Sequence, residues 1–247
     1  TREGRLNISA MLRNTKKFLA EGAENICEAA FTQNGCYCAV DILHKTSDGY
    51  EIYEVKSSTE LKDVYLWDAA YKRWVLEACG LKIVGVYIVD IDNQYVRQGD
   101  VEIHKLFRIN DVTAAIAPFY ADVAAKTALA KAYLAQQEEP EQDLGVHCRK
   151  PYDCVYRQYC ERNLPSPSVF DLYRITAKKA YEYYDQGIVS FDDVVKSGIE
   201  LNPAQRRQVE FEQLQLPTRV DQLGVRTVLD TLTYPLYFLD FESFQLC

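Results

Sequence analysis

The chain has 247 residues, of which 48% are hydrophobic and 26% are charged, with a net charge of −8. This balance is typical of a globular protein and excludes a disordered, collagen-like or low-complexity chain. An acidic chain binds phosphate backbones poorly unless its basic residues cluster locally. No run of about 18 apolar residues is present and no secretion signal is visible, so we expect no membrane span and a cytoplasmic location.

The N-terminal part of the chain predicts one helix followed by three short strands. Apolar residues recur at helical spacing over residues 5–20. Turn residues at 33–35 and 47–49 separate the strands, which favours an antiparallel meander. The three strand segments, which are rich in β-branched, aromatic and Cys residues, are 24–31, 36–44 and 50–58.

A helix and a buried strand follow the meander. Apolar residues at helical spacing predict a helix over residues 62–79, which Gly80 ends. The nearly continuous apolar run 82–91 predicts a strand that is buried on both faces. Beyond it we expect short edge strands at 95–99 and 104–109 and an Ala-rich helix over 111–137.

The order of these elements indicates the fold class. Three strands, a helix and a fourth strand make a mixed α/β arrangement, in which the helix crosses over between the third and fourth strands. The composition then shifts toward Glu, Gln, Pro, Cys and Tyr. We interpret residues 1–137 as a core domain, 138–166 as a cysteine-rich segment, 167–232 as a helical linker region and 233–247 as the first strand of a truncated second α/β domain.

Two carboxylates and a lysine fall on the expected meander. Asp41 lies in an otherwise apolar strand, and Glu54 and Lys56 lie on the next strand segment. Residues i and i+2 of a strand project from the same face, so Glu54 and Lys56 point together and an antiparallel neighbour brings Asp41 beside them. Two carboxylates suit Mg²⁺ or Mn²⁺, and the lysine suits an attacking water or a phosphate. The alternative is a half-exposed strand with a Glu–Lys pair on its solvated face.

At these residues the sequence resembles the PD-(D/E)XK nucleases. The D-x₁₂-E-x-K pattern on a hairpin followed by a helix is similar to the RecB-like branch, which includes the iron–sulfur nucleases of CRISPR adaptation. The resemblance implies a restriction-endonuclease-like core in which Asp41, Glu54 and the Val55 carbonyl bind Mg²⁺ or Mn²⁺ and Lys56 is catalytic. It also implies an activity, the metal-dependent hydrolysis of phosphodiester bonds in DNA.

The helix after the hairpin departs from this resemblance at one position. RecB-like nucleases carry a Gln on this helix with a Tyr nearby, and Lys72 stands about where that Gln is expected. Asp68 and Tyr71 are candidates for supporting roles beside it. The alternative for these two residues is a carboxylate in the N-terminal half of the helix and a core aromatic residue.

Three evenly spaced cysteines follow the core domain. Cys148, Cys154 and Cys160 lie among aromatic residues, and thiolates are soft ligands that favour zinc or iron–sulfur clusters. RecB-like iron–sulfur nucleases place three cysteines after the core and one before it, so the resemblance implies a 4Fe–4S cluster. This chain has no cysteine before Cys27 to supply the fourth ligand. Zinc bound with His147 is the second possibility, and three free, partly buried cysteines are the third.

A pair of acidic residues interrupts the apolar run near the C-terminus. Residues 234–244 predict a buried strand in which Asp240 and Glu242 share one face. The pair resembles the first motif of DEDD-type exonucleases and implies part of a second metal site, and an ordinary edge strand is the alternative. Taken together, the motifs resemble a bacterial family that continues from a RecB-like nuclease domain into a DEDD exonuclease-like domain of unknown function. Because the chain starts at Thr1 without Met and stops at Cys247, we interpret it as a piece of a longer protein.

Two functions follow from these expectations. The first is a metal-dependent deoxyribonuclease, with DNA as its partner and Mg²⁺ or Mn²⁺ as its cofactor. The second is a catalytically impaired nuclease fold that binds nucleic acid or has a structural role. Lys72 and the missing fourth cysteine favour the second function, whereas the intact set of Asp41, Glu54 and Lys56 favours the first.

Overall fold

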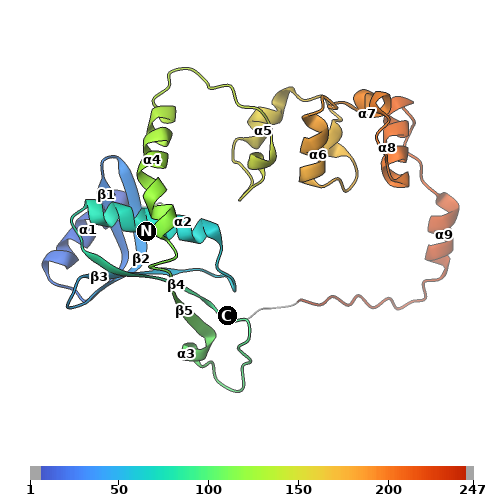
Figure 1. Ribbon diagram of the computed structural model, residues 1–247. Helices are drawn as coiled ribbons and strands as arrows, with labels where there is room; N and C mark the ends of the chain where they lie inside the picture. The colour runs from blue at the N-terminus through green and yellow to red at the C-terminus, as the bar shows by residue number, and fades with distance from the viewer. Residues whose placement is uncertain (1–6, 243–247) are drawn as a thin grey trace. The chain divides into compact units, whose positions relative to one another are not determined.

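The computed structural model describes residues 7–242 of the chain. The described chain divides between Glu138 and Glu139 into two compact units, which we describe separately. The first unit holds the five described strands, and the second is built from short helices (Figure 1).

One five-stranded mixed sheet forms the centre of the first unit. Its strands lie side by side in chain order, with the first three in an antiparallel meander and the last two antiparallel. The third and fourth strands are parallel, which requires a crossover connection. The expected mixed α/β fold with a crossover helix is therefore confirmed. The strands are β1 (Asn25–Gln33), β2 (Cys36–Lys45), β3 (Tyr50–Val55), β4 (Ile83–Ile91) and β5 (Phe107–Asp111).

Two tight turns fix the register of the meander. Asn34 and Gly35 both have positive φ angles, of 51° and 72°, as a two-residue hairpin turn of type I′ requires. In the second turn, the Thr46 hydroxyl accepts a hydrogen bond from the Gly49 amide at 3.1 Å. A side chain at Gly49 would collide with the backbone carbonyl of Lys82, so glycine allows this turn to approach the start of β4.

Helix α2 (Asp63–Ala78) is the crossover helix and contacts β1, β2 and β4. Helix α4 (Ala117–Leu134) packs against α2, and α1 (Ile8–Ala20) packs against β1 (Figure 1). The hydrophobic core fills the space between helices and sheet. Its wholly buried members include Val40, Ile52, Val75, Leu76 and Val86.

Most of the elements expected for this unit are confirmed, and one is wrong. The expected helices over 5–20, 62–79 and 111–137 and the strand over 82–91 all form, with shifted ends. Residues 95–99, expected as an edge strand, lie in an irregular loop instead. The sheet ends at β5, so this loop has no neighbouring strand to supply backbone hydrogen bonds. Segment 104–109 is divided between the short helix α3 (Ile103–Leu106) and the start of β5.

The second unit begins with the segment that contains the three cysteines. Its regular structure is limited to short helical turns: η2 (Val146–Cys148), α5 (Arg157–Cys160) and η3 (Glu161–Asn163). Leu144 and Cys148 of this segment form a small buried cluster with Tyr181, which comes from further along the chain.

The rest of the second unit is helical and has a hydrophobic core of its own. The core includes Val169, Phe191, Val194 and Val209. The helices are η4 (Val169–Asp171), α6 (Ala177–Tyr184), α7 (Phe191–Ser197), α8 (Pro203–Gln213) and α9 (Gln222–Asp230). α9 buries none of its residues.

The strand expected over residues 234–244 does not form in residues 234–242. These residues have no regular structure, and large apolar side chains such as Tyr237 and Phe238 are exposed. A strand needs a neighbour to complete its backbone hydrogen bonds, and none of the described strands pairs with this segment. The expectation of a buried strand is therefore wrong for these residues, and residues 243 and 244 lie outside the described part.

The longest helix among residues 7–242 is α4, with 18 residues. Neither α4 nor any other helix in that range is long and apolar enough to cross a membrane.

Candidate active site

The candidate site lies where β2 separates from β3. The backbone ladder between these strands stops at the pair Ile42–Tyr53. One residue further, the Asp41 side chain replaces the ladder, and its Oδ2 accepts a hydrogen bond from the Val55 amide at 2.7 Å. Asp41 therefore lies beside the end of β3, next to Glu54.

Glu54 is the buried centre of the site. It is 0% exposed, because strand alternation places it on the same face as the core residue Ile52. A buried carboxylate destabilises the fold unless charged or hydrogen-bonding partners reach it. Its neighbours therefore decide what this residue can do.

Two lysines contact the same oxygen of Glu54. Lys56, which follows β3, places its Nζ 3.3 Å from Glu54 Oε2, and Lys72 of α2 places its Nζ 2.5 Å from that atom. Both ammonium groups also contact Asp68 Oδ2, Lys56 at 2.9 Å and Lys72 at 3.4 Å. Glu54, Lys56, Asp68 and Lys72 thus form a closed arrangement of alternating charge, which we call the charge ring.

Helix α2 supplies two members of the charge ring from one face. Asp68 and Lys72 are four residues apart, so their side chains lie one above the other on the helix. Tyr71 points elsewhere, since its hydroxyl donates a hydrogen bond to the Tyr37 carbonyl at 3.0 Å. Of the three residues expected to have supporting roles, the structure brings Asp68 and Lys72 to the site but not Tyr71.

Burial governs the ionisation of Glu54 and Lys56 in different ways. Loss of solvent is the largest effect on Glu54 and raises the pKa of its carboxyl, against the opposing effects of Lys72 and Lys56. At Lys56, burial lowers the pKa, but the hydrogen bonds and charges of Asp68 and Glu54 outweigh it and raise the pKa overall. Lys56 is therefore an ammonium cation at neutral pH.

One oxygen of Glu54 has no partner. Glu54 Oε1 is buried and makes no hydrogen bond, although buried polar atoms are almost always satisfied. A divalent cation between Asp41 and Glu54 would satisfy this atom with the oxygen ligands that Mg²⁺ and Mn²⁺ prefer. Residues 7–242 contain no group of three or more His, Cys, Asp or Glu side chains placed to hold a metal. A cation here would therefore depend on two carboxylates completed by backbone and water oxygens.

A second buried carboxylate anchors the segment after Lys56. Asp90 of β4 is buried, and Arg108 of β5 binds both of its oxygens at 3.0 Å. Arg108 also donates a hydrogen bond to the Thr59 carbonyl at 2.8 Å. The sequence pattern alone did not predict this support. Its signal was a lone carboxylate in a strand expected to be buried on both faces, where an unpaired charge is destabilising.

The three cysteines of the second unit remain separate thiols. Cys148 is buried, Cys160 packs against its cluster, and Cys154 is exposed with its amide bound to the Cys148 carbonyl at 2.9 Å. His147 is exposed, and its Nε2 lies 3.4 Å from the Gln142 amide nitrogen. Because the cysteines take no part in a three-ligand group within the described chain, the iron–sulfur cluster and the zinc site stay predictions.

Asp240 and Glu242 lie in the exposed segment after α9. Asp240 Oδ1 accepts a hydrogen bond from the amide of its neighbour Phe241 at 2.8 Å. Without a strand, alternation does not place the two carboxylates on one face. The expected geometry of a second metal site is therefore wrong for residues 234–242.

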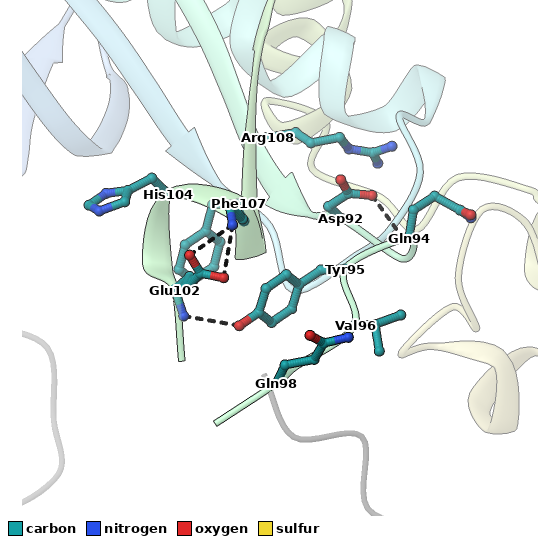
Figure 2. Close-up of a pocket in the computed structure, with 10 residues that line it drawn as sticks. Asp92, Gln94, Tyr95, Val96, Gln98, Glu102, His104, Phe107 and Arg108 are labelled. Atoms are coloured by element: carbon teal, nitrogen blue, oxygen red, sulfur yellow. Dashed lines mark hydrogen bonds and ion pairs between the residues drawn. The ribbon is translucent and has the colours of Figure 1, made fainter. Parts of the chain in front are cut away.

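A pocket of about 610 Å³ opens between the loop after β4 and the start of β5 (Figure 2). On its wall, the Tyr95 hydroxyl accepts a hydrogen bond from the Glu102 amide at 3.0 Å, and Lys105 pairs with Glu102. Arg108 also lines the pocket but is already bound to Asp90. The pocket is thus separate from the charge ring, whose residues do not line it.

Comparison of the chain with known proteins gives no relative, so the geometry of the candidate site is the main guide to function. No family model, curated protein or solved structure matches the chain. The function has to be inferred from Asp41, Glu54 and the charge ring, together with the resemblance of the sequence motifs.

Proposed function

We propose that the protein is a metal-dependent nuclease that hydrolyses phosphodiester bonds in DNA. The observation that carries this proposal is the environment of Glu54. It is wholly buried, keeps one oxygen without a partner, lies beside Asp41 and contacts Lys56. This arrangement agrees with the D…E-x-K motif of the RecB-like PD-(D/E)XK nucleases, and the five-stranded sheet with its crossover helix would be the corresponding core.

In this proposal Asp41, Glu54 and the Val55 carbonyl hold Mg²⁺ or Mn²⁺. The bound cation makes a water more acidic and shields the charge of the phosphate. Asp41 has a further role in the protein itself. Its carboxylate accepts a hydrogen bond from the Val55 amide and so helps to fix the backbone at Val55, whose carbonyl is the third expected ligand. Glu54 has a free oxygen, Oε1, for the cation.

Lys56 acts as a fixed positive charge rather than as a base. Its ammonium is held between Glu54 and Asp68, so it is already oriented before a substrate binds. A positioned donor of this kind stabilises the charge that develops on a phosphate and orients the attacking water. Arg108 supports this position through its hydrogen bond to Thr59, three residues after Lys56.

The substitution Lys56→Ala tests the proposal. We expect the variant to fold, because Lys72 still contacts Glu54. DNA cleavage should fall by about a hundredfold or more, as it does when one positioned charge donor is lost from an active site. The assay uses labelled single- and double-stranded DNA with Mg²⁺ or Mn²⁺. Lys105→Ala removes the same charge from an exposed ion pair and should retain full activity.

Two results would contradict the assignment. Cleavage that survives in the double variant Lys56→Ala and Asp41→Ala would show that Asp41 and the charge ring are not the active site. If cleavage disappeared instead with Asp240→Ala, the activity would belong to the acidic pair near the C-terminus.

A nuclease fold that binds DNA without cleaving it is the second candidate, and Lys72 favours it. An ammonium group lies 2.5 Å from Glu54, at a position where the RecB-like pattern has a neutral Gln. Under this alternative, the wild-type protein binds labelled DNA in EDTA but cleaves none with Mg²⁺ or Mn²⁺. Fluorescence anisotropy alongside the cleavage assay separates the two functions.

A further inference from the structure

In the charge ring, the Lys72 ammonium supplies positive charge to the buried Glu54 carboxylate. Its Nζ makes the shortest contact of the ring, with Glu54 Oε2, and its side chain is only 12% exposed. The backbone of α2 is fixed near Lys72, because Val75 and Leu76, about one turn further on, are wholly buried in the core. The ammonium group is therefore kept beside the buried carboxylate rather than in solvent.

Asp68 offers the same ammonium group a second partner. Lys72 Nζ lies 3.4 Å from Asp68 Oδ2, and the Asp68 side chain is 36% exposed, against 1% for Glu54. Breaking an ion pair costs little stabilising free energy when the carboxylate is partly solvated, because water replaces the lost partner. The cost is large when the carboxylate is buried. Together with Lys56, Lys72 is therefore needed most at Glu54 when no divalent cation is bound there, and it keeps Asp68 as a partner when such a cation arrives.

We propose that Lys72 is a built-in competitor of the divalent cation at Glu54 and sets the metal affinity of the site. This inference rests on the proposed function, because it requires that Asp41 and Glu54 bind the cation. Like charges repel strongly in a buried site. A divalent cation on the free Oε1 of Glu54 therefore weakens the contact of the Lys72 ammonium with the neighbouring Oε2 and favours its contact with Asp68. The site is then occupied by metal only when the concentration of the divalent ion is high enough to offset the repulsion from Lys72.

Binding of Mn²⁺ to the DNA-free protein, followed by electron paramagnetic resonance of the free ion, tests the inference. We expect Lys72→Gln, which removes the charge, to bind Mn²⁺ about tenfold more tightly than the wild type, equivalent to about 1.4 kcal/mol. Lys72→Arg keeps the charge and should bind as weakly as the wild type. Arg73→Gln removes a charge from the next position of α2, where Arg73 pairs with Glu77, and should leave the affinity unchanged.

A measurement on the wild-type protein covers the case in which Lys72→Gln folds poorly. Acylation of lysines, quantified by mass spectrometry, reports how accessible each Nζ is. We expect Mg²⁺ to raise the labelling of Lys72 several-fold, because the cation displaces its ammonium group from Glu54. Labelling of the exposed Lys105 should not change.

The outcomes separate this inference from the proposed function. If the wild type and Lys72→Gln bind Mn²⁺ equally well and Mg²⁺ does not change Lys72 labelling, the competition is overturned and the metal site stands. If neither protein binds Mn²⁺ and labelling never responds, both the inference and the metal site are overturned. Tighter binding in Lys72→Gln that Asp41→Asn abolishes supports both.

Discussion

The Cys38 thiol lies in the core of the first unit, close enough to the charge ring to sense its charges. Burial is the largest effect and raises the pKa of Cys38 to about 12, with Glu54 and Asp68 adding to it and Lys72 opposing it. The thiol of the unfolded chain has its ordinary pKa of 9.0. Between these values unfolding releases a proton, so the free energy of unfolding falls as pH rises from 9 toward 12.

We expect Cys38→Ala to flatten this alkaline loss of stability. Urea unfolding of both proteins at neutral pH and at several pH values above 9 measures the two slopes. In the folded wild type, Cys38 should also resist iodoacetamide while the exposed Cys154 reacts. Parallel slopes together with rapid alkylation of Cys38 would contradict the prediction.

The sequence predicts some site residues better than others, for a geometric reason. Asp41 and Glu54 lie on two strands joined by one short turn, and Lys56 directly follows the second of them, so alternation and turn position suffice to bring the three together. The contact of Lys72 with Glu54 depends on how α2 crosses the sheet, which the sequence pattern does not specify. The spacing of Asp68 and Lys72 on one helix face was the available signal, but it does not tell which strand residue the pair meets.

At the scale of the elements, Arg108 of β5 connects β4 with the segment after Lys56. It binds the Asp90 carboxylate of β4 and donates a hydrogen bond to the Thr59 carbonyl. We expect Arg108→Ala to lower the free energy of unfolding by clearly more than the loss of an exposed ion pair does, because it leaves the buried Asp90 carboxylate with too few partners. Asn110 still donates one hydrogen bond to Asp90 at 3.2 Å, and the Arg108 side chain is 38% exposed, so the loss should be smaller than for a wholly buried pair. Urea denaturation of the two proteins measures it.

Lys105→Ala provides the comparison for this measurement. Lys105 is exposed and pairs only with Glu102 in the described chain, and such surface pairs contribute little to stability. If Arg108→Ala costs no more than Lys105→Ala, then Asp90 is not a charged buried anchor.

Whole elements were predicted well where local pattern and tertiary surroundings agree. The helical spacing of 62–79 and the apolar run 82–91 both correspond to elements that pack on the same core. Residues 234–244 have an equally apolar, strand-like composition, yet residues 234–242 stay irregular and exposed. Apolar composition gives a preference for the strand conformation, but a strand exists only where a neighbour pairs with it.

On the scale of the whole molecule, two separate cores predict unfolding in two steps. The sheet unit has its own core, and the helical unit has another. The connecting residues 135–142 are irregular and mostly exposed. Both tryptophans, Trp67 and Trp74, lie in the first unit, so their fluorescence reports on that unit alone.

We expect urea transitions followed by tryptophan fluorescence and by far-ultraviolet circular dichroism not to coincide. Limited proteolysis should cut early within residues 135–142, as well as in the exposed segment 234–242, and leave an N-terminal fragment with an intact sheet. Superimposable transitions, with no early cut within residues 135–142, would show that the two units unfold as one.

The five residues Asp41, Glu54, Lys56, Asp68 and Lys72 all come from one hairpin and the helix that follows it. A single uninterrupted stretch of coding sequence therefore specifies both the carboxylates and the ammonium groups that balance them. An insertion outside residues 41–72 that keeps β4 and β5 in the sheet would leave the spacing of every member unchanged. The spacing of the site residues is thus specified locally, whereas β4 and Arg108 still have to support them.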